Sequence, residues 1–252
     1  MSDEAEKSIT ISKSTLWKVG FVFLAVVLIA SVWTGGFGLR GVSTGSTVQQ
    51  QNTGATQKQA VTDLSVFTNN PDLYPSLGPA NSKNTVIEFL DFQCPFCAMA
   101  SGLPSWISQY QTQYGDLMGS AGKVETMAKQ GKLRFIAIPM SFLGQESVYA
   151  AEAGYCANEQ GKFWEMHDAL FMAQTQGENN GKYNKDKLEI IAQGISGLDQ
   201  SKFKSCLESD KYASAVQTAA RQASTAASGT PTFFVNGKQV TPSGTAIQAA
   251  LV

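Results

Sequence analysis

The sequence predicts an α/β fold built around a cysteine pair that follows a central strand. Residues 84–92 are rich in β-branched and aromatic side chains and are apolar on both faces, as a central strand is. Cys94 and Cys97 come directly after them. A helical pattern then fills residues 145–221, and strands return at 232–241. We therefore expect one α/β domain with an inserted helical subdomain.

The elements around the motif follow from local patterns. Pro95 favours the first turn of a helix, and apolar spacing continues this helix through residues 99–107, with a kink expected at Pro104. Gly131 closes a second helical stretch, and residues 133–139 predict the next strand. The motif is thus placed between a strand and a helix.

The end of the chain has a strong hairpin signal. Asn236 and Gly237 separate the predicted strands 232–235 and 239–241, and this dipeptide favours a two-residue hairpin turn. A last short helix is expected to end at Val252.

Length and composition limit the possible functions. A chain of 252 residues with 43% hydrophobic residues is long enough for one sizeable domain with appendages. The net charge is only -1, so the chain has no basic surface that could neutralise many phosphates. We expect no nucleic-acid partner.

An uncharged apolar run near the amino terminus predicts a membrane anchor. Residues 16–34 form the expected single transmembrane helix, with Trp17 and Trp33 as interfacial aromatics. The alternative is a cleaved signal peptide, but Val32 and Trp33 stand where small residues are wanted. Lys13 and Lys18 favour a cytoplasmic segment 1–15.

The sequence after the anchor changes in composition. Residues 35–60 are rich in Gly, Ser, Thr, Gln and Asn, which predicts a flexible linker because such a segment cannot bury enough apolar surface to fold. The folded domain is expected at 61–252. This order places the domain on the extracytoplasmic side of the cell membrane.

The cysteine pair predicts thiol chemistry. Cys94, at the start of a helix, is the expected nucleophile because unpaired backbone N–H groups and positive potential favour its thiolate. Cys97, one turn inside the helix, is the expected resolving thiol. A zinc site is the alternative, but it needs further ligands, and the chain has one histidine. We expect neither a metal nor another cofactor.

Two acidic residues precede the motif. Glu88 shares a strand face with Val86 and Leu90, and burial there would raise its pKa and let it exchange protons with Cys97. The alternative is a solvent-facing strand residue. Asp91 points to the other face, where we interpret it as structural or exposed at the rim.

Other polar and sulfur-containing residues have simpler interpretations. We interpret His167 as a partly buried side chain among aromatics rather than a ligand, and Met140, Met166 and Met172 as core or groove residues. Pro231 stands at the edge of a strand, and on sequence physics alone a trans bond is favoured there.

Taken together, these features resemble the DsbA-like branch of the thioredoxin superfamily. The likeness rests on an acidic residue six positions before a CPxC motif, a helical insertion, then Gly229, Thr230, Pro231 and a strand, and residues 160–167 also resemble a typical stretch. It covers residues 61–252.

The resemblance implies specific roles. It implies that Pro231 is cis and lies beside the active-site sulfurs, and that Thr230 offers backbone groups to a substrate chain. Cys156 and Cys206 are expected either as buried free cysteines or, as in many members of the branch, as a structural disulfide. Phe96 departs from the branch, whose best-known members have histidine in this dipeptide, and this weakens the expected support for the Cys94 thiolate.

The expected function is an extracytoplasmic thiol–disulfide oxidoreductase that forms disulfides in exported, unfolded or reduced proteins. A separate membrane redox partner would recycle it. A disulfide isomerase or reductase is one alternative, and a tethered copper-handling module using Cys94 and Cys97 is another. The sequence ahead of the domain offers no dimerisation module, so we expect a monomer.

Overall fold

The computed structural model describes residues 63–252. The predicted transmembrane anchor at 16–34, the linker at 35–60 and the predicted start of the domain at residue 61 lie outside the described residues. Within residues 63–252, none of the helices has the length and apolar character needed to cross a membrane.

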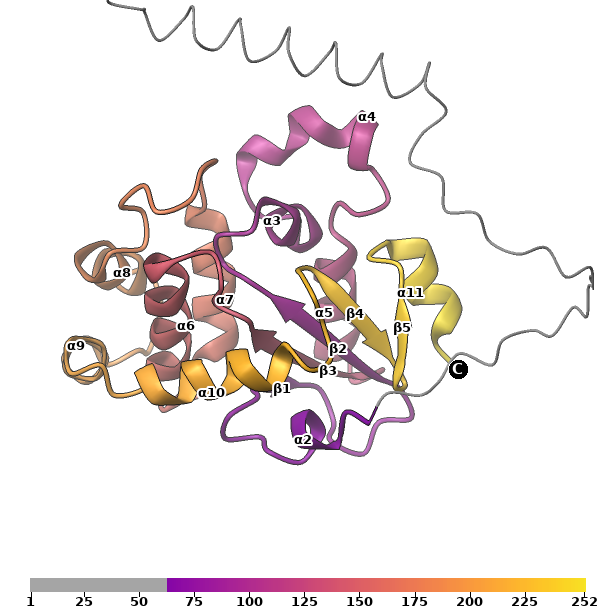
Figure 1. The fold of residues 1–252 in the computed structure, drawn as a ribbon, viewed down its shortest axis with the longest axis horizontal. Helices are drawn as coiled ribbons and strands as arrows, with labels where there is room; N and C mark the ends of the chain where they lie inside the picture. Colours follow the sequence, from indigo (N-terminus) through magenta and orange to yellow (C-terminus); the bar gives the residue numbers. More distant parts are fainter. Residues whose placement is uncertain (1–62) are drawn as a thin grey trace, which may run out of the picture. The chain divides into compact units, whose positions relative to one another are not determined.

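The described chain alternates between strands and helices around one mixed sheet (Figure 1). In chain order the elements are α2 Ser65–Thr68, β1 Ser76–Leu77, β2 Thr85–Leu90, α3 Pro95–Ser101, the 3-10 helix η1 Ser105–Tyr110, α4 Gln111–Tyr114, α5 Ser120–Lys129, β3 Arg134–Pro139, α6 Gln145–Asn158, α7 Phe163–Ala173, α8 Lys185–Ala192, α9 Gln200–Glu208, α10 Ala213–Ala223, β4 Thr232–Val235, β5 Lys238–Val240 and α11 Gly244–Ala250.

The sheet has the strand order β1-β3-β2-β4-β5. Strands β2 and β3 are parallel, and the other neighbouring pairs are antiparallel. The central position of β2 explains its apolar character on both faces. Glu88, in the middle of β2, pairs in register with Ala137 of β3 and Phe233 of β4.

Helices cover both faces of the sheet. The side chains of Ile87 and Phe89 on β2 join a core cluster with residues of α2 and α10. Val86 belongs to a second cluster, which contains residues of α3, α5 and α11. Because side chains alternate along a strand, Glu88 lies on the face of Val86 and Leu90, as the sequence predicted.

The insertion forms a helical subdomain beside the sheet. In Figure 1, α6, α7, α8 and α9 gather at the left of the sheet, and α10 leads the chain back beneath it. Apolar residues of α6 to α9 form one buried cluster that also contains Leu90, Phe92, Cys94 and Cys97. The insertion therefore packs directly against the active-site end of β2.

The structure confirms most predicted elements. Strands β2, β3, β4 and β5 occur where expected, and Asn236 and Gly237 both have positive φ at the hairpin turn. The first helix differs, because α3 ends at Ser101 and does not continue through a kink at Pro104. Gly102 adopts the left-handed conformation that ends a helix, and Pro104 precedes the separate helix η1. At the carboxyl end, α11 stops at Ala250.

Candidate active site

The two cysteines of the motif lie at the first turn of α3. Cys94 has an extended backbone as the N-cap residue, and Pro95 begins the helix. Both thiols are free, and both residues are buried: Cys94 is 5% exposed and Cys97 is 0% exposed. The sulfur nearer the surface is thus the one at the helix start.

The two thiols have opposite electrostatic environments. A hydrogen bond from the Cys97 thiol, with smaller contributions from Thr230 and from the backbone of Cys97 and Phe96, outweighs burial and lowers the pKa of Cys94 to about 7. Burial, together with the hydrogen bond to Cys94 and its charge, raises the pKa of Cys97 well above its ordinary value. Near neutral pH, the thiolate of the pair is therefore carried by Cys94.

The loop before β4 closes the other side of the site. The Thr230–Pro231 peptide bond is cis, as the family resemblance implied. The Cys94 thiol donates a hydrogen bond to the Thr230 carbonyl oxygen at 3.4 Å. The structure thus brings Cys94, Cys97, Thr230 and Pro231 together.

Glu88 is a buried carboxyl near the sulfurs. It is 1% exposed, and neither of its carboxyl oxygens has a hydrogen-bond partner among the described residues. Burial raises its pKa well above the ordinary value, and the charges of Cys94 and Glu125 add to this rise. The solvent-facing alternative for Glu88 is therefore wrong, and burial favours the protonated form of the carboxyl.

Asp91 is fully buried, so only the structural half of its prediction is correct. Its carboxylate accepts hydrogen bonds from the backbone of Gln93 at 2.9 Å and Phe142 at 2.9 Å, and from the Ser147 hydroxyl at 2.6 Å. These bonds fix the turn between β2 and Cys94 against the start of α6. The rim-exposed interpretation of Asp91 is wrong because the residue is 0% exposed.

A loop of the insertion holds the same turn from the other side. The Gln174 side-chain amide donates to the carbonyl oxygens of Phe92 at 3.3 Å and Cys94 at 3.1 Å. The side-chain Oε1 of Gln93 accepts a hydrogen bond from the Asn179 backbone N–H at 2.6 Å. Sequence reasoning missed Gln93, Gln174 and Asn179, since no periodic pattern or motif marks them. Their role follows only from contacts between distant segments.

Phe96 sits at the surface of the motif. It is 41% exposed, and its ring lies edge-on to the Tyr114 ring with centroids 5.5 Å apart. Tyr114 and the neighbouring Tyr110 belong to the segment that follows α3. The phenylalanine therefore adds apolar surface beside Cys94, while its backbone, rather than its side chain, supports the thiolate.

The single histidine of the chain is buried among aromatic rings. His167 is 1% exposed among the rings of Phe92, Trp164 and Phe171. Met140 and Met166 are buried, whereas Met172 is exposed, so the core interpretation is wrong for Met172.

One group of side chains in the described part of the chain has metal-ligating atoms within 4.8 Å of one another: Glu125, His167 and Asp168. Lys129 Nζ already lies 2.5 Å from Glu125 Oε1 and 3.8 Å from Asp168 Oδ2. An ammonium group therefore occupies the cationic position in this group, and the cysteines are not part of it.

The second cysteine pair is bridged. Cys156 of α6 and Cys206 of α9 form a disulfide across a sequence separation of 50 residues. Both residues are buried in the cluster of the insertion. Of the two alternatives left open by the sequence, the structure contains the disulfide.

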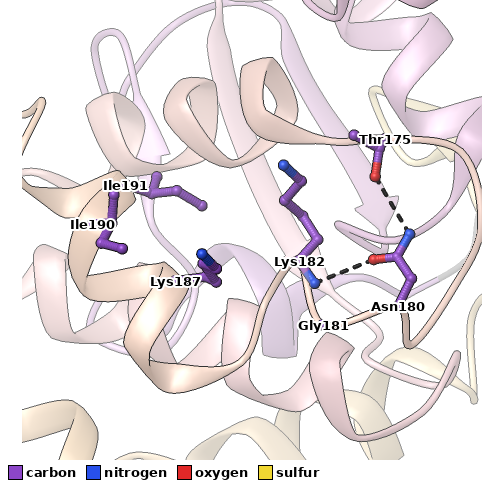
Figure 2. A pocket seen from close by; sticks show the side chains of 7 residues that line it. All are labelled: Thr175, Asn180, Gly181, Lys182, Lys187, Ile190 and Ile191. Carbon is purple, nitrogen blue, oxygen red and sulfur yellow. Dashed lines mark hydrogen bonds between the residues drawn. The ribbon is translucent and has the colours of Figure 1, made fainter.

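A surface pocket of about 540 Å³ lies on the insertion (Figure 2). Figure 2 shows Asn180 donating to the Thr175 hydroxyl and accepting from the Lys182 backbone at one side of it. None of the predicted site residues lines it, so it is separate from the cysteine site. Its lining residues are Thr175, Asn180, Gly181, Lys182, Lys187, Ile190 and Ile191.

Comparisons with known proteins agree with this geometry. Residues 118–251, more than half of the chain, match the thioredoxin family, a range that includes Thr230 and Pro231 but begins after the cysteine pair. The probable disulfide bond formation protein D of Bacillus anthracis is 25% identical over 179 residues, which are 70% of this chain and 76% of that protein. The Na(+)/H(+) antiporter NhaA 3 of Salinispora tropica is 29% identical over 172 residues, which are 67% of this chain and 22% of the antiporter. The chain thus spans about a fifth of the length of that relative.

Solved structures share the fold. Oxidised BdbD from Bacillus subtilis matches with a TM-score of 0.56 at 22% identity, over 72% of this chain and 92% of that one. A thioredoxin-like oxidoreductase from Silicibacter pomeroyi matches with a TM-score of 0.55 at 23% identity, over 75% of this chain and 95% of that one. The described domain thus shares its fold with these thioredoxin-like structures, and it carries a dithiol at the start of α3. The chain belongs to the thioredoxin family.

Proposed function

We propose that this chain is an extracytoplasmic oxidase that forms disulfides in exported proteins. The observation that carries the proposal is the contrast between the two thiols: Cys94 has a pKa lowered to about 7, whereas the pKa of Cys97 is raised. A stable Cys94 thiolate favours the reduced enzyme, and a stabilised reduced form makes the enzyme disulfide an oxidant. The name of the Bacillus anthracis relative supports the same direction.

The reaction has two exchange steps. A substrate thiolate attacks the Cys94 sulfur of the Cys94–Cys97 disulfide, the sulfur–sulfur bond breaks, and its electron pair leaves on Cys97. A second substrate thiolate then attacks the substrate sulfur bonded to Cys94 and releases the Cys94 thiolate. The substrate loses two electrons and gains a disulfide, while the enzyme becomes the dithiol.

Glu88 supplies the proton for the first step. Cys97 is fully buried, so its thiolate cannot be stabilised by water as it leaves. Glu88 lies close enough to Cys97 that its carboxylate charge, when present, raises the pKa of the thiol. Proton transfer from Glu88 to Cys97 avoids a buried thiolate. Thr230 and Pro231 would position the substrate chain against Cys94.

The proposed setting uses the part of the chain before the described domain. An anchor at 16–34 and a linker at 35–60 would keep the domain at the outer surface of the cell membrane as a monomer. A membrane redox partner would accept the two electrons and restore the disulfide. Exported proteins in the reduced state would be the substrates.

The test uses the full chain in detergent with two clients, one reduced and unfolded and one with scrambled disulfides. The proposal predicts faster oxidation of the first client than rescue of the second. The opposite preference would favour an isomerase. A reduction potential measured against glutathione, lower than that of glutathione, would favour a reductase. Metal analysis, with client assays repeated in chelator, tests the copper-handling alternative.

A further inference from the structure

The buried acid Glu88 raises a question about the route of its proton. Both oxygens of Glu88 are buried and without a hydrogen-bond partner in the described part of the chain. If Glu88 donates a proton to Cys97, its carboxylate is left in an apolar environment, and it must be reprotonated in every cycle. The proton therefore needs a path from solvent to β2.

A second acidic side chain lies on this path. Glu125 of α5 is 6% exposed, and its charge contributes to the raised pKa of Glu88. Helix α5 packs against α3, which begins at the cysteine pair, and against β3, whose Ala137 is the register partner of Glu88. Ala121, Val124 and Ala128 form the buried stripe of α5, and Glu125 lies within that stripe. Glu125 thus faces the interior near Glu88, on the same side of the sheet.

Glu125 is also connected to solvent. Lys129 lies 2.5 Å from its Oε1, and the Lys129 side chain is 55% exposed. Asp168 of α7 lies 3.8 Å from the same ammonium and is partly exposed. The Glu125 carboxylate therefore has one side toward the buried acid and the other toward charged groups at the surface.

The seam between α5, α7 and the sheet holds further unpartnered polar atoms. His167 Nε2 and Trp164 Nε1 are buried without hydrogen-bond partners among residues 63–252. The Trp164 ring lies 5.1 Å from the Phe135 ring, and Phe135 shares a strand face with Ala137, the register partner of Glu88. The seam beside Glu125 thus contains buried polar atoms of the kind that internal water commonly satisfies in native proteins.

We propose that Glu125 relays protons between solvent and Glu88, and through Glu88 to Cys97. This inference rests on the proposed function, because it assigns the proton supply of that same reaction. Glu125 acts through Glu88, so it is a positioning residue and not a catalytic one. In substrate oxidation, the proton passes from solvent near Lys129 to Glu125, then to Glu88, and finally to the Cys97 sulfur as its bond to Cys94 breaks.

The charged and titratable groups around the relay come from three elements. Several groups can therefore contribute to the pH profile of the measured step, so the experiment must change one group at a time. The groups that face Glu125 or its ammonium partner are Glu88 of β2, Lys129 of α5, and Glu165, His167 and Asp168 of α7.

The experiment follows a single opening of the enzyme disulfide by excess dithiothreitol in the full chain, with quenched-flow alkylation of Cys97, across pH and in H₂O and D₂O. Glu125→Gln should slow this step about tenfold, change its pH profile and enlarge the solvent isotope effect, since proton transfer becomes limiting. Glu152→Gln is the matched control, because Glu152 is a fully buried helical glutamate of α6 with a raised pKa, placed beside Tyr212 instead. It should leave all three readouts unchanged.

A second variant guards against loss of folding. Lys129→Met keeps the Glu125 carboxyl but removes the ammonium beside it, and the relay predicts a shifted pH profile for the same step. Wild-type profiles and isotope effects in both Glu125→Gln and Lys129→Met would overturn the relay. Equal slowing in Glu152→Gln would also overturn it. A wild-type chain whose disulfide does not react with dithiothreitol would instead overturn the proposed function, and the relay with it.

Discussion

The two cysteine pairs of this chain have the same chemistry available and opposite environments. Cys94 and Cys97 are free thiols separated by two residues at a helix start, beside a cis-proline and an unpartnered acid. Cys156 and Cys206 are bridged between two helices of the insertion, across 50 residues. The first pair is held near a surface that can receive another sulfur, and the second is enclosed in a core. Location, and not cysteine content, separates a reactive pair from a structural one.

Buried carboxyl groups in the insertion and at the cysteine site also differ in their hydrogen-bond partners. In the insertion, both carboxyl oxygens of Glu146 accept backbone hydrogen bonds, from Gly181 at 2.6 Å and from Tyr183 at 2.8 Å. Glu88, at the cysteine site, has no such partner among the described residues. Unsatisfied polar groups cost stability, and they concentrate where chemistry requires them. Glu146 thus acts as a structural carboxyl, whereas Glu88 is available for proton transfer.

The largest effect is expected at Cys94. Cys94→Ser removes the nucleophile, so the rate of thiol–disulfide exchange should fall by about a thousandfold or more. The measurement is oxidation of a reduced client. The Cys156→Ala/Cys206→Ala double variant should retain most of the rate when it is assayed on the same client under conditions in which the variant stays folded. Equal losses in the two variants would remove the functional distinction between the pairs.

Of the two cysteine pairs, Cys156 and Cys206 should contribute more to the free energy of unfolding. Removing the Cys156–Cys206 disulfide releases a 50-residue loop in the unfolded chain, and the chain-entropy relation gives a loss of about 4 kcal/mol in the free energy of unfolding. Denaturant unfolding of the Cys156→Ala/Cys206→Ala variant measures this loss. Reducing only the Cys94–Cys97 pair serves as the control. A loss below about 1 kcal/mol would show that packing in the insertion makes the bridge redundant.

Of the two cysteine pairs, only the reactive pair should make the free energy of unfolding depend on pH. The pKa of Cys94 is lowered from 9.0 to about 7 in the folded protein, so between these values the unfolded chain binds the extra proton and stability rises with pH. The gain is up to about 3 kcal/mol. The measurement is the difference in unfolding free energy between the reduced wild type and reduced Cys94→Ser, which isolates Cys94 together with its electrostatic effect on Glu88 and Cys97. A difference independent of pH from 7 to 9 would contradict the lowered pKa.

The smallest effect concerns Glu88. Glu88→Leu replaces an unpartnered buried acid with an apolar side chain, so the free energy of unfolding near neutral pH should rise by about 1–2 kcal/mol. Because the folded pKa of Glu88 is raised, this gain should grow as pH increases above 4.5. Client oxidation should slow at the same time. Faster turnover, or a loss of stability, would show that Glu88 supports packing and not proton transfer.

The sequence was sufficient for features with local signals. The strand before the motif, the proline at the start of α3 and the Asn236–Gly237 hairpin each depend on neighbouring residues, and each was predictable. Glu125 also had a signal, because it lies at helical spacing from Ala121 and Ala128. The end of α3 was missed because the apolar spacing continued past Gly102, whereas the helical backbone conformation ended before it.

Long-range partners could not be predicted in the same way. Asp91 is structural because Phe142 and Ser147 bring donors to it from the segment after β3. Gln174 reaches the carbonyl of Cys94 across 80 residues of sequence. The cis bond before Pro231 was expected from the family resemblance, whereas local sequence preferences favoured trans. Pairing of this kind is fixed by the tertiary fold, and no spacing rule encodes it.

The most direct test of the contrast between the thiols is a titration of thiolate absorbance in the reduced full chain with the Cys156–Cys206 disulfide intact. The structure predicts one thiolate forming with a midpoint near pH 7, its loss in Cys94→Ser, and no second thiolate until well above pH 9. A midpoint near 9, or a low midpoint that survives in Cys94→Ser, would contradict the assignment of Cys94 as the reactive sulfur.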